Sequence, residues 1–176
     1  MSQSIKPLRT AGILLGIGLG GFVDGILLHQ VLQLHNMLSA KYFPDTLANE
    51  QINMFWDGMF HAVTWLVTAA GLWRLWRVAQ RNESPLQSNV FVGSMVLGWG
   101  LFNLVEGVID HQILGLHNVV QRAAPGPQLF WDLAFLVVGG IGFIGLGVWQ
   151  IRRGQRLLAE RQKMGRGLRV AGRNAS

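Results

Sequence analysis

The chain has 176 residues, of which half are hydrophobic and 14% are charged, with a mean hydropathy of +0.31. Soluble domains carry about a quarter charged residues, so this composition favours a membrane protein. There is no cysteine, which excludes disulfides, thiolate metal sites and cysteine nucleophiles. No Ser/His/Asp order or phosphate-binding loop indicates a familiar hydrolase or transferase, and the sequence supports no claim that the protein is an enzyme.

Four apolar stretches are each long enough to cross about 30 Å of hydrocarbon, which takes about 20 helical residues. They cover residues 10–35, 53–76, 88–113 and 129–151. Basic residues flank one set of their ends, and the positive-inside rule therefore places both termini in the cytoplasm. We expect an all-α integral membrane four-helix bundle, N-in/C-in. Gly12, Gly16 and Gly20 recur every four residues in the first stretch, as in closely packed membrane helices.

The expected organisation is a cytoplasmic N-terminus over residues 1–9, a single four-span membrane domain over 10–153 and a basic cytoplasmic tail over 154–176. From Arg152 onward the chain carries eight basic residues against Glu160 alone. Such a segment is typical of contact with anionic lipid. The lipid bilayer is thus the expected partner, and the basic charge is no evidence for nucleic acid.

The two halves of the chain repeat the same polar pattern. With a shift of 82 residues, "VDGILLHQ" from 23 aligns with "VEGVIDHQ" from 105, and "LHN" from 34 aligns with "LHN" from 116. The tripeptide "FWD" at 55–57 also recurs at 130–132. We interpret residues 10–81 and 88–153 as two tandem duplicated helix hairpins, related by a pseudo-twofold axis along the membrane normal.

Ionisable side chains cluster in and beside the expected spans. Each costs about 2.5–3.5 kcal/mol at the bilayer centre, so their accumulation indicates partners inside the bundle. Imidazole and carboxylate groups together suit a transition metal such as Cu, Fe or Zn. The candidate metal ligands are His29, His111, Asp57, Asp132, His61, Asp24, Glu106, His35 and His117.

Helical geometry sorts these candidates by depth. His29 and His111 would lie level with Asp57 and Asp132, which predicts a ring of two histidines and two aspartates in the outer half of the bundle. Three further candidates would lie beneath this ring: His61, Asp24 and Glu106. The position that matches His61 is Leu136, so the symmetry is broken at this level.

The same geometry predicts which candidates can meet. Asp57 and His61 are four residues apart, share a helix face and could bind one ion. His29 would be turned by about 140° from Asp24, and His35 would lie about 16 Å from Asp24 along the axis. Asp24 and His35 could therefore share an ion only if the helix breaks.

Three other interpretations remain open. His29 and His111 could be the axial ligands of one b-type heme, since they lie on different helices at equal depth. Paired histidines and carboxylates could also form a proton or ion carrier without a cofactor. Finally, the polar groups could be a buried hydrogen-bond network that specifies helix register.

The motifs "FVDGILLHQVLQLHNM", "FWDGMFH" and "NLVEGVIDHQILGLHN" resemble the small bacterial membrane proteins grouped as domain of unknown function 2243. The resemblance covers about residues 8–153. It implies a multi-pass protein of the bacterial inner membrane, and an association with respiratory oxidase assembly proteins that would favour copper or heme handling. That family typically has a doubled histidine where this chain has His35-Asn36 and His117-Asn118, which favours His29 and His111 over the outermost histidines as ligands.

Overall fold

The computed structural model describes the backbone of residues 4–174 and the side chains of residues 4–165. Over the described backbone the chain is helical and contains no strand. Four long helices are present, three of which contain π-helical segments (η). In chain order the elements are α1 (Lys6–Val23), η1 (Asp24–Val31), α2 (Leu47–Arg81), α3 (Ser88–Glu106), η2 (Gly107–Ile113), α4 (Pro125–Ala134), η3 (Phe135–Gly142) and α5 (Phe143–Asn174).

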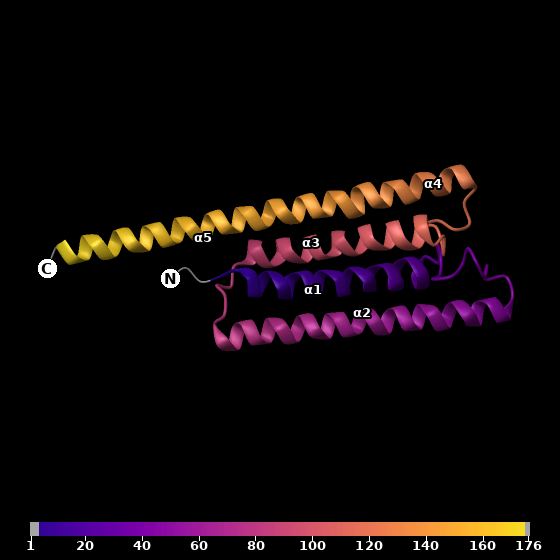
Figure 1. Cartoon of the computed structure of the whole chain (residues 1–176), viewed down its shortest axis with the longest axis horizontal. Helices are drawn as coiled ribbons and strands as arrows, with labels where there is room; N and C mark the ends of the chain where they lie inside the picture. The colour runs from indigo at the N-terminus through magenta and orange to yellow at the C-terminus, as the bar shows by residue number, and fades with distance from the viewer. Residues whose placement is uncertain (1–3, 175–176) are drawn as a thin grey trace.

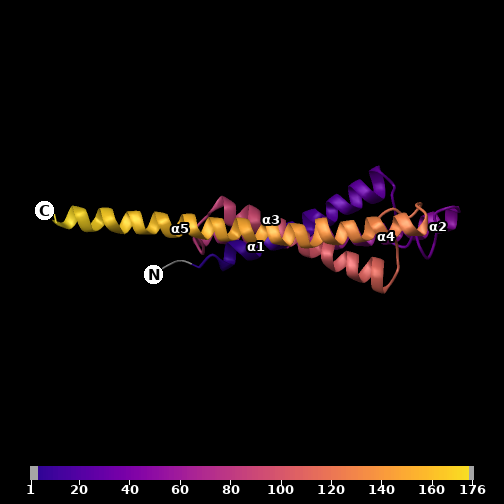
Figure 2. The ribbon, with the colours of Figure 1, turned by 90° about the horizontal axis from the view of Figure 1, so that it is seen from above.

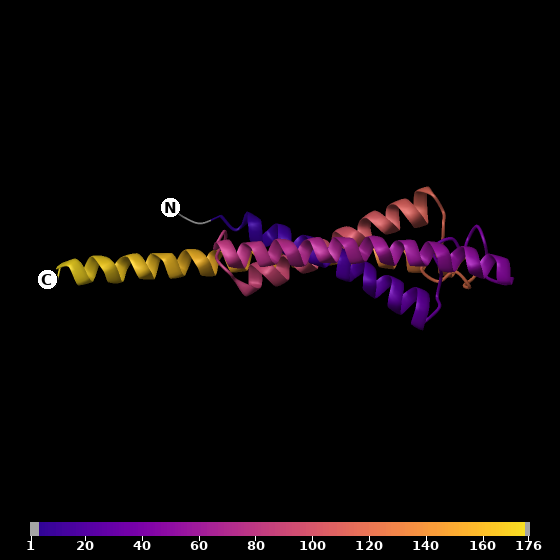
Figure 3. The ribbon, with the colours of Figure 1, turned by 90° about the horizontal axis from the view of Figure 1, so that it is seen from below.

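Helices α1 and α3 form the centre of the bundle (Figure 1). Helix α2 packs along α1, while η3 and α5 pack along α3 on the other side. Seen from above and from below, α1 and α3 cross and then diverge toward the end of the bundle that carries the 32–46 and 114–124 loops (Figures 2 and 3). The start of α1 and the end of α5 both point toward the opposite end (Figure 1).

Glycines permit the close crossing of α1 and α3. A Cβ atom on Gly16 would overlap the backbone carbonyl of Met95, and one on Gly98 would overlap the carbonyl of Ile13. A Cβ on Gly12 would lie 2.6 Å from the Cβ of Ser94. The close helix contact expected from the glycine spacing in the first span is therefore confirmed.

Within the described part of the chain, three helical stretches are long and apolar enough to span a membrane: Lys6–Val31, Ser88–Ile113 and Pro125–Gly165. The second expected span, residues 53–76, lies inside α2, which has 35 residues but is not among these three. Asp57, His61 and Thr64 interrupt its apolar sequence and lower its hydropathy. The predicted end of the first span at residue 35 is wrong, because the helix ends at Val31.

A left-handed residue ends each of the two central helices. Gln33 has φ 50° and Gly115 has φ 55°. Around Gln33, the backbone amide of Leu34 donates to the backbone carbonyl of Leu28, six residues back, which closes a turn wider than the preceding π-helical turns. The backbone amide of Leu116 donates in the same way to the backbone carbonyl of Asp110. Both turns reverse the chain, so that the following segment runs back over the diverging helix ends.

Candidate metal centre

Four histidines and four carboxylates gather where α1 and α3 diverge. His29 is 2% exposed, His35 3% and His117 0%, so these imidazoles are almost completely shielded from solvent. Buried ionisable groups are costly unless they are paired or bind an ion. The buried members of the group are Asp24, His29, His35, Asp57, Glu106, His111, His117 and Asp132.

The π-helical form of η1 brings Asp24 and His29 together. Their Oδ2 and Nε2 atoms are 3.1 Å apart. The expectation that these side chains are turned by about 140° from each other assumed α-helical geometry and is wrong, because hydrogen bonds in a π-helix join residues five apart and bring such residues onto one face. Segments of this kind are frequent at functional sites.

His35 reaches the cluster because the helix ends before it. Its Nε2 lies 3.9 Å from Oδ1 of Asp24, although eleven residues separate the two in sequence. A continuous helix would keep them about 16 Å apart along its axis. The turn at Gln33 instead carries His35 back to the level of Asp24. Thus the helix break, which was the condition for these two residues to share an ion, is present.

His35 and His117 are each held by the loop of the other half. Nδ1 of His35 donates to the carbonyl of Val119 at 2.9 Å, and Nδ1 of His117 donates to the carbonyl of Met37 at 3.1 Å. A carbonyl oxygen only accepts, so the proton of each neutral ring is on Nδ1. The Nε2 atom of each ring therefore presents a lone pair to the interior of the cluster.

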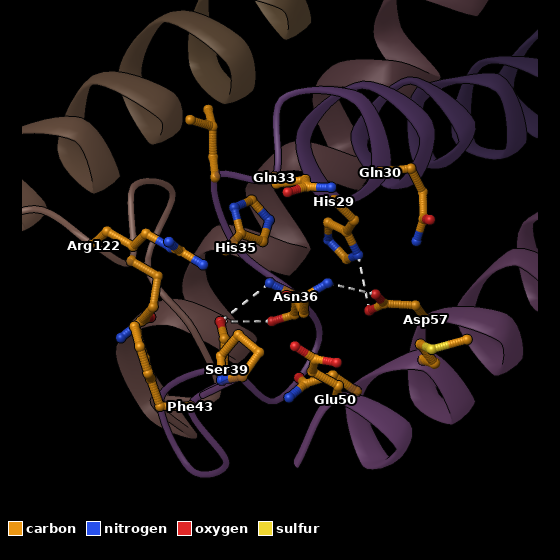
Figure 4. A pocket seen from close by; sticks show the side chains of 15 residues that line it. His29, Gln30, Gln33, His35, Asn36, Ser39, Phe43, Glu50, Asp57 and Arg122 are labelled. Atoms are coloured by element: carbon orange, nitrogen blue, oxygen red, sulfur yellow. Dashed lines mark hydrogen bonds and ion pairs between the residues drawn. The ribbon is translucent and has the colours of Figure 1, made fainter. Parts of the chain in front are cut away.

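His29 is held in a similar way by a carboxylate of α2. Nδ1 of His29 lies 3.0 Å from Oδ1 of Asp57, as the dashed line in Figure 4 marks. Asp57 also accepts hydrogen bonds from the side chain of Asn36, at 2.9 Å, and from the backbone amide of Met37, at 2.8 Å. Asp57 thus fixes both the His29 ring and the loop that carries His35.

Asp132 repeats most of this arrangement in the second half. It accepts from the side chain of Asn118 at 2.7 Å and from the backbone amide of Val119 at 2.8 Å. The Oδ1 atom of Asp132 is 3.4 Å from Nδ1 of His111. Neither ring nitrogen of His111 forms a hydrogen bond with a described residue. The two halves are therefore alike in how they hold their loops and differ in how tightly they hold the deeper histidine.

Four buried side chains lie close enough together to be able to hold a metal ion. One atom from each of His29, His35, Glu106 and His117 can be chosen so that all four lie within 4.8 Å of one another. Nε2 of His35, Nε2 of His117 and Oε2 of Glu106 are buried without a hydrogen-bond partner among the described residues, while Nε2 of His29 lies 3.1 Å from Oδ2 of Asp24. Metal–nitrogen bonds are about 2.0–2.1 Å long, so two ligand atoms of one ion lie up to about 4 Å apart and only small movements would bring these four onto one ion.

The remaining imidazoles lie beside this set. His111 is not among the four, although its ring centroid is 4.7 Å from that of His117. Nδ1 of His61 donates to the backbone carbonyl of Asp57 at 2.8 Å, and the ring packs against Phe60. The carboxylate of Asp57 is engaged elsewhere, so the structure does not bring Asp57 and His61 together on one ion.

Burial keeps the two outermost histidines neutral. His35 and His117 lie beyond the ends of the apolar helical stretches, at residues 31 and 113. Burial lowers the pKa of His35 to about 4 and lowers that of His117 well below its ordinary value. Neutral imidazole is the form that binds a metal ion.

Sequence reasoning missed the residues that support the ligands. Asn36 and Asn118 donate to the aspartates, and the carbonyls of Met37 and Val119 accept from the histidines. The repeated His-Asn dipeptide was the available signal, since an amide beside each histidine can join it to a nearby carboxylate. The backbone carbonyls carry no sequence signal at all.

The chain belongs to the family described as "Predicted membrane protein (DUF2243)", whose profile matches residues 11–154. No curated protein and no solved structure matches the chain. The matched range includes every residue of the buried cluster.

Proposed function

We propose that this membrane protein binds one transition-metal ion through His29, His35, His117 and Glu106, and that it serves metal handling or redox chemistry in the bacterial inner membrane. The observation that carries the proposal is that the buried Nε2 atoms of His35 and His117 and the buried Oε2 of Glu106, which have no hydrogen-bond partner among the described residues, belong to the group that converges with His29. Leaving such acceptors without a partner costs about 1–3 kcal/mol each. A bound cation would satisfy all of them.

The donor set restricts the kind of ion. Imidazole and carboxylate ligands suit Zn, Cu(II) and Fe, whereas Mg and Ca prefer oxygen ligands alone. The supporting contacts also fit a metal site, because metal-ligating histidines usually donate their other ring N–H to a carbonyl or carboxylate. Here the carbonyls of Val119 and Met37 and the carboxylate of Asp57 take these roles.

The packing of the rings favours an ion over heme. His35 and His117 stack with centroids 4.5 Å apart, while His29 contacts His35 and His111 contacts His117. A heme held by His29 and His111 would have to displace this stacked pair from its backbone carbonyls. A proton or ion carrier without a cofactor is the second candidate, and the half-buried Asp110 beside the cluster favours it.

We also propose that the chain is a tandem duplication that spans the membrane four times, with both termini in the cytoplasm. Reciprocal contacts support the duplication: Gly16 meets Met95 as Gly98 meets Ile13, at the same shift of 82 residues. The packing of α2 along α1 supports its role as the remaining span. The basic tail would then contact anionic lipid at the cytoplasmic face.

The proposed link to respiratory-chain assembly proteins depends on which metal is bound. Copper or iron would be consistent with it, because respiratory oxidases contain both. Zinc, which has no redox chemistry, would favour a structural or hydrolytic role instead. Metal analysis of the protein as isolated therefore comes before any search for a protein partner.

Metal analysis and an absorption spectrum of the purified protein test this proposal. We expect bound metal without a Soret band in the wild type. Replacing His35 or His117 with Ala should weaken binding by more than about 100-fold, since changes to supporting residues alone cost about 10–100-fold. His111→Ala is the matched control and should lose far less, and His61→Leu, which copies Leu136, should bind nearly as well as the wild type.

Ligands of one ion act as a unit, so the double variant His35→Ala, His117→Ala should bind little worse than either single variant. Glu106→Gln keeps the side-chain shape and tests the carboxylate in a chain that should fold. Full metal occupancy in the double variant would overturn the proposed site. A Soret band that disappears in His29→Ala and His111→Ala would favour heme instead.

A further inference from the structure

A cavity opens beside the buried cluster at its loop end. It has a volume of about 320 Å³ and is lined by residues of η1, of the first loop and of α2, and by Gln121 and Arg122 of the second loop. Figure 4 shows His29, His35 and Asp57 on its wall, with Arg122 and Phe43 on one side and Glu50 on another. Because the candidate ligands are at most 5% exposed, an ion needs a route to reach them, and this cavity adjoins two of the four.

His29 separates the cavity from the interior of the cluster. Its Nδ1 contacts Asp57, which lines the cavity, at 3.0 Å, and its Nε2 lies 3.1 Å from Asp24, which does not. One imidazole therefore bridges a carboxylate on the cavity side and a carboxylate on the cluster side.

The matching positions in the second half differ. When the two FWD tripeptides are aligned, which needs a shift of 75 residues, the residue that matches Glu50 is Pro125. The segment between η2 and α4 is also shorter than the one between η1 and α2. Gly115 occupies the position of Gln33, which lines the cavity. The second half therefore lacks both a rim carboxylate and an amide side chain that the first half supplies to its cavity.

We propose that this cavity is the entry route for a divalent cation, which passes from the loop side of the bundle along Glu50, Asp57 and His29 to the buried ligands. This inference rests on the proposed metal site and adds the path by which the ion reaches the ligands. Glu50 and Arg122 are exposed residues of the cavity lining, where Glu50 attracts the cation and Arg122 repels it (Figure 4). The guanidinium of Arg122 lies 5.8 Å from the centroid of the Phe43 ring, which keeps this positive charge at the rim.

Opposite signs of charge at the rim permit a sharp kinetic test. We would follow Co²⁺ uptake by the metal-free protein with stopped-flow absorbance at low ionic strength. Glu50→Gln should slow uptake and Arg122→Gln should speed it, each by about threefold, because one charge near the entrance changes the local concentration of a divalent cation by a small factor. Both effects should fade in high salt. Glu160→Gln, at the far end of the molecule, is the control for net charge.

A bulky side chain tests the route itself. Gln30 lines the cavity, and its match in the second half is Gln112. Gln30→Trp should slow both uptake and release by more than about tenfold and leave the equilibrium affinity unchanged, whereas Gln112→Trp should leave the rates unchanged. Equal slowing by the two tryptophan variants, or rate changes of the same sign in Glu50→Gln and Arg122→Gln, would overturn the route alone. Absence of Co²⁺ binding by the wild type at equilibrium would overturn both the route and the site.

Discussion

His35 and His117 stack face to face, with ring centroids 4.5 Å apart and planes 5° apart. Each ring donates to the backbone carbonyl of the second residue after the other histidine, so each loop positions the histidine of the opposite loop. Two more backbone hydrogen bonds join the loops, from the amide of Ala40 to Leu116 and from that of Gln121 to Leu34. The two histidines therefore form a unit that belongs to neither half alone.

Asp57→Asn should lower the stability of the fold. Asp57 is buried and accepts from His29, Asn36 and Met37, and an amide would place its own N–H groups against at least one of these donors. Hydrogen bonds to charged groups contribute roughly 1.5–3 kcal/mol, so we expect a loss of about 3 kcal/mol in the free energy of unfolding. Thermal unfolding in detergent measures it. The control is Asp45→Asn, an exposed aspartate, which should change stability by less than about 0.5 kcal/mol.

Gly98→Ala should also destabilise the bundle. The new Cβ would overlap the carbonyl of Ile13 at the point where α1 and α3 cross, and backbone cannot move away as a flexible side chain can. Overpacking of this kind costs about 1–3 kcal/mol. Gly58→Ala in α2 is the matched control, because nothing lies within 4 Å of its added Cβ. That variant should be neutral or slightly stabilising, since alanine favours helix by about 1 kcal/mol. An equal melting temperature for the two variants would contradict the close contact.

Stability should depend on pH through Glu83. The side chain of Arg74 donates to Glu83 and holds the pKa of that carboxyl below its ordinary value of 4.5. A lowered pKa in the folded state means that the pair stabilises the fold above pH 4.5 and that this contribution is lost as the pH falls through the lowered pKa. Melting temperatures from pH 7 to pH 3 should therefore converge for the wild type and Glu83→Gln. A constant difference across that range would show that Glu83 acts through something other than its charge.

Reporter fusions test the proposed topology. A reporter at residue 42 should be active outside the cytoplasm, and one after residue 176 should be active inside it. Because α2 is the least apolar of the four helices, the informative alternative is a chain in which only the other three cross. An odd number of crossings would place the two termini on opposite sides, so an additional fusion at the N-terminus distinguishes the two cases.

The sequence was sufficient to predict the helices and the close crossing, because span length and glycine spacing depend on local composition. It also predicted that His29 and Asp57 would lie at one depth, and the structure pairs them at 3.0 Å. Depth along a helix follows from the rise per residue and needs no knowledge of packing. These features are set by one-dimensional regularities that can be read from a single chain.

The sequence did not predict which histidines would converge. The π-helical segment that joins Asp24 to His29 and the left-handed turn at Gln33 both change the direction of side chains, and neither has a clear signature. Gln33 is an unusual residue for a left-handed conformation, which glycine adopts more readily. As a result His35 and His117, which were ranked below His111, lie with His29 and Glu106 in the closest group.

The exchange of carbonyls between the two loops also sets an order of events during synthesis. While only the first hairpin has been synthesised, His35 cannot donate to the carbonyl of Val119, and the carbonyl of Met37 cannot accept from His117, because Val119 and His117 have not yet been added to the chain. The buried cluster can therefore form only after the second hairpin has been inserted and its loop has closed over the first. A nascent or truncated chain would lack the complete cluster, so an ion bound at the proposed metal site would report that both hairpins have assembled.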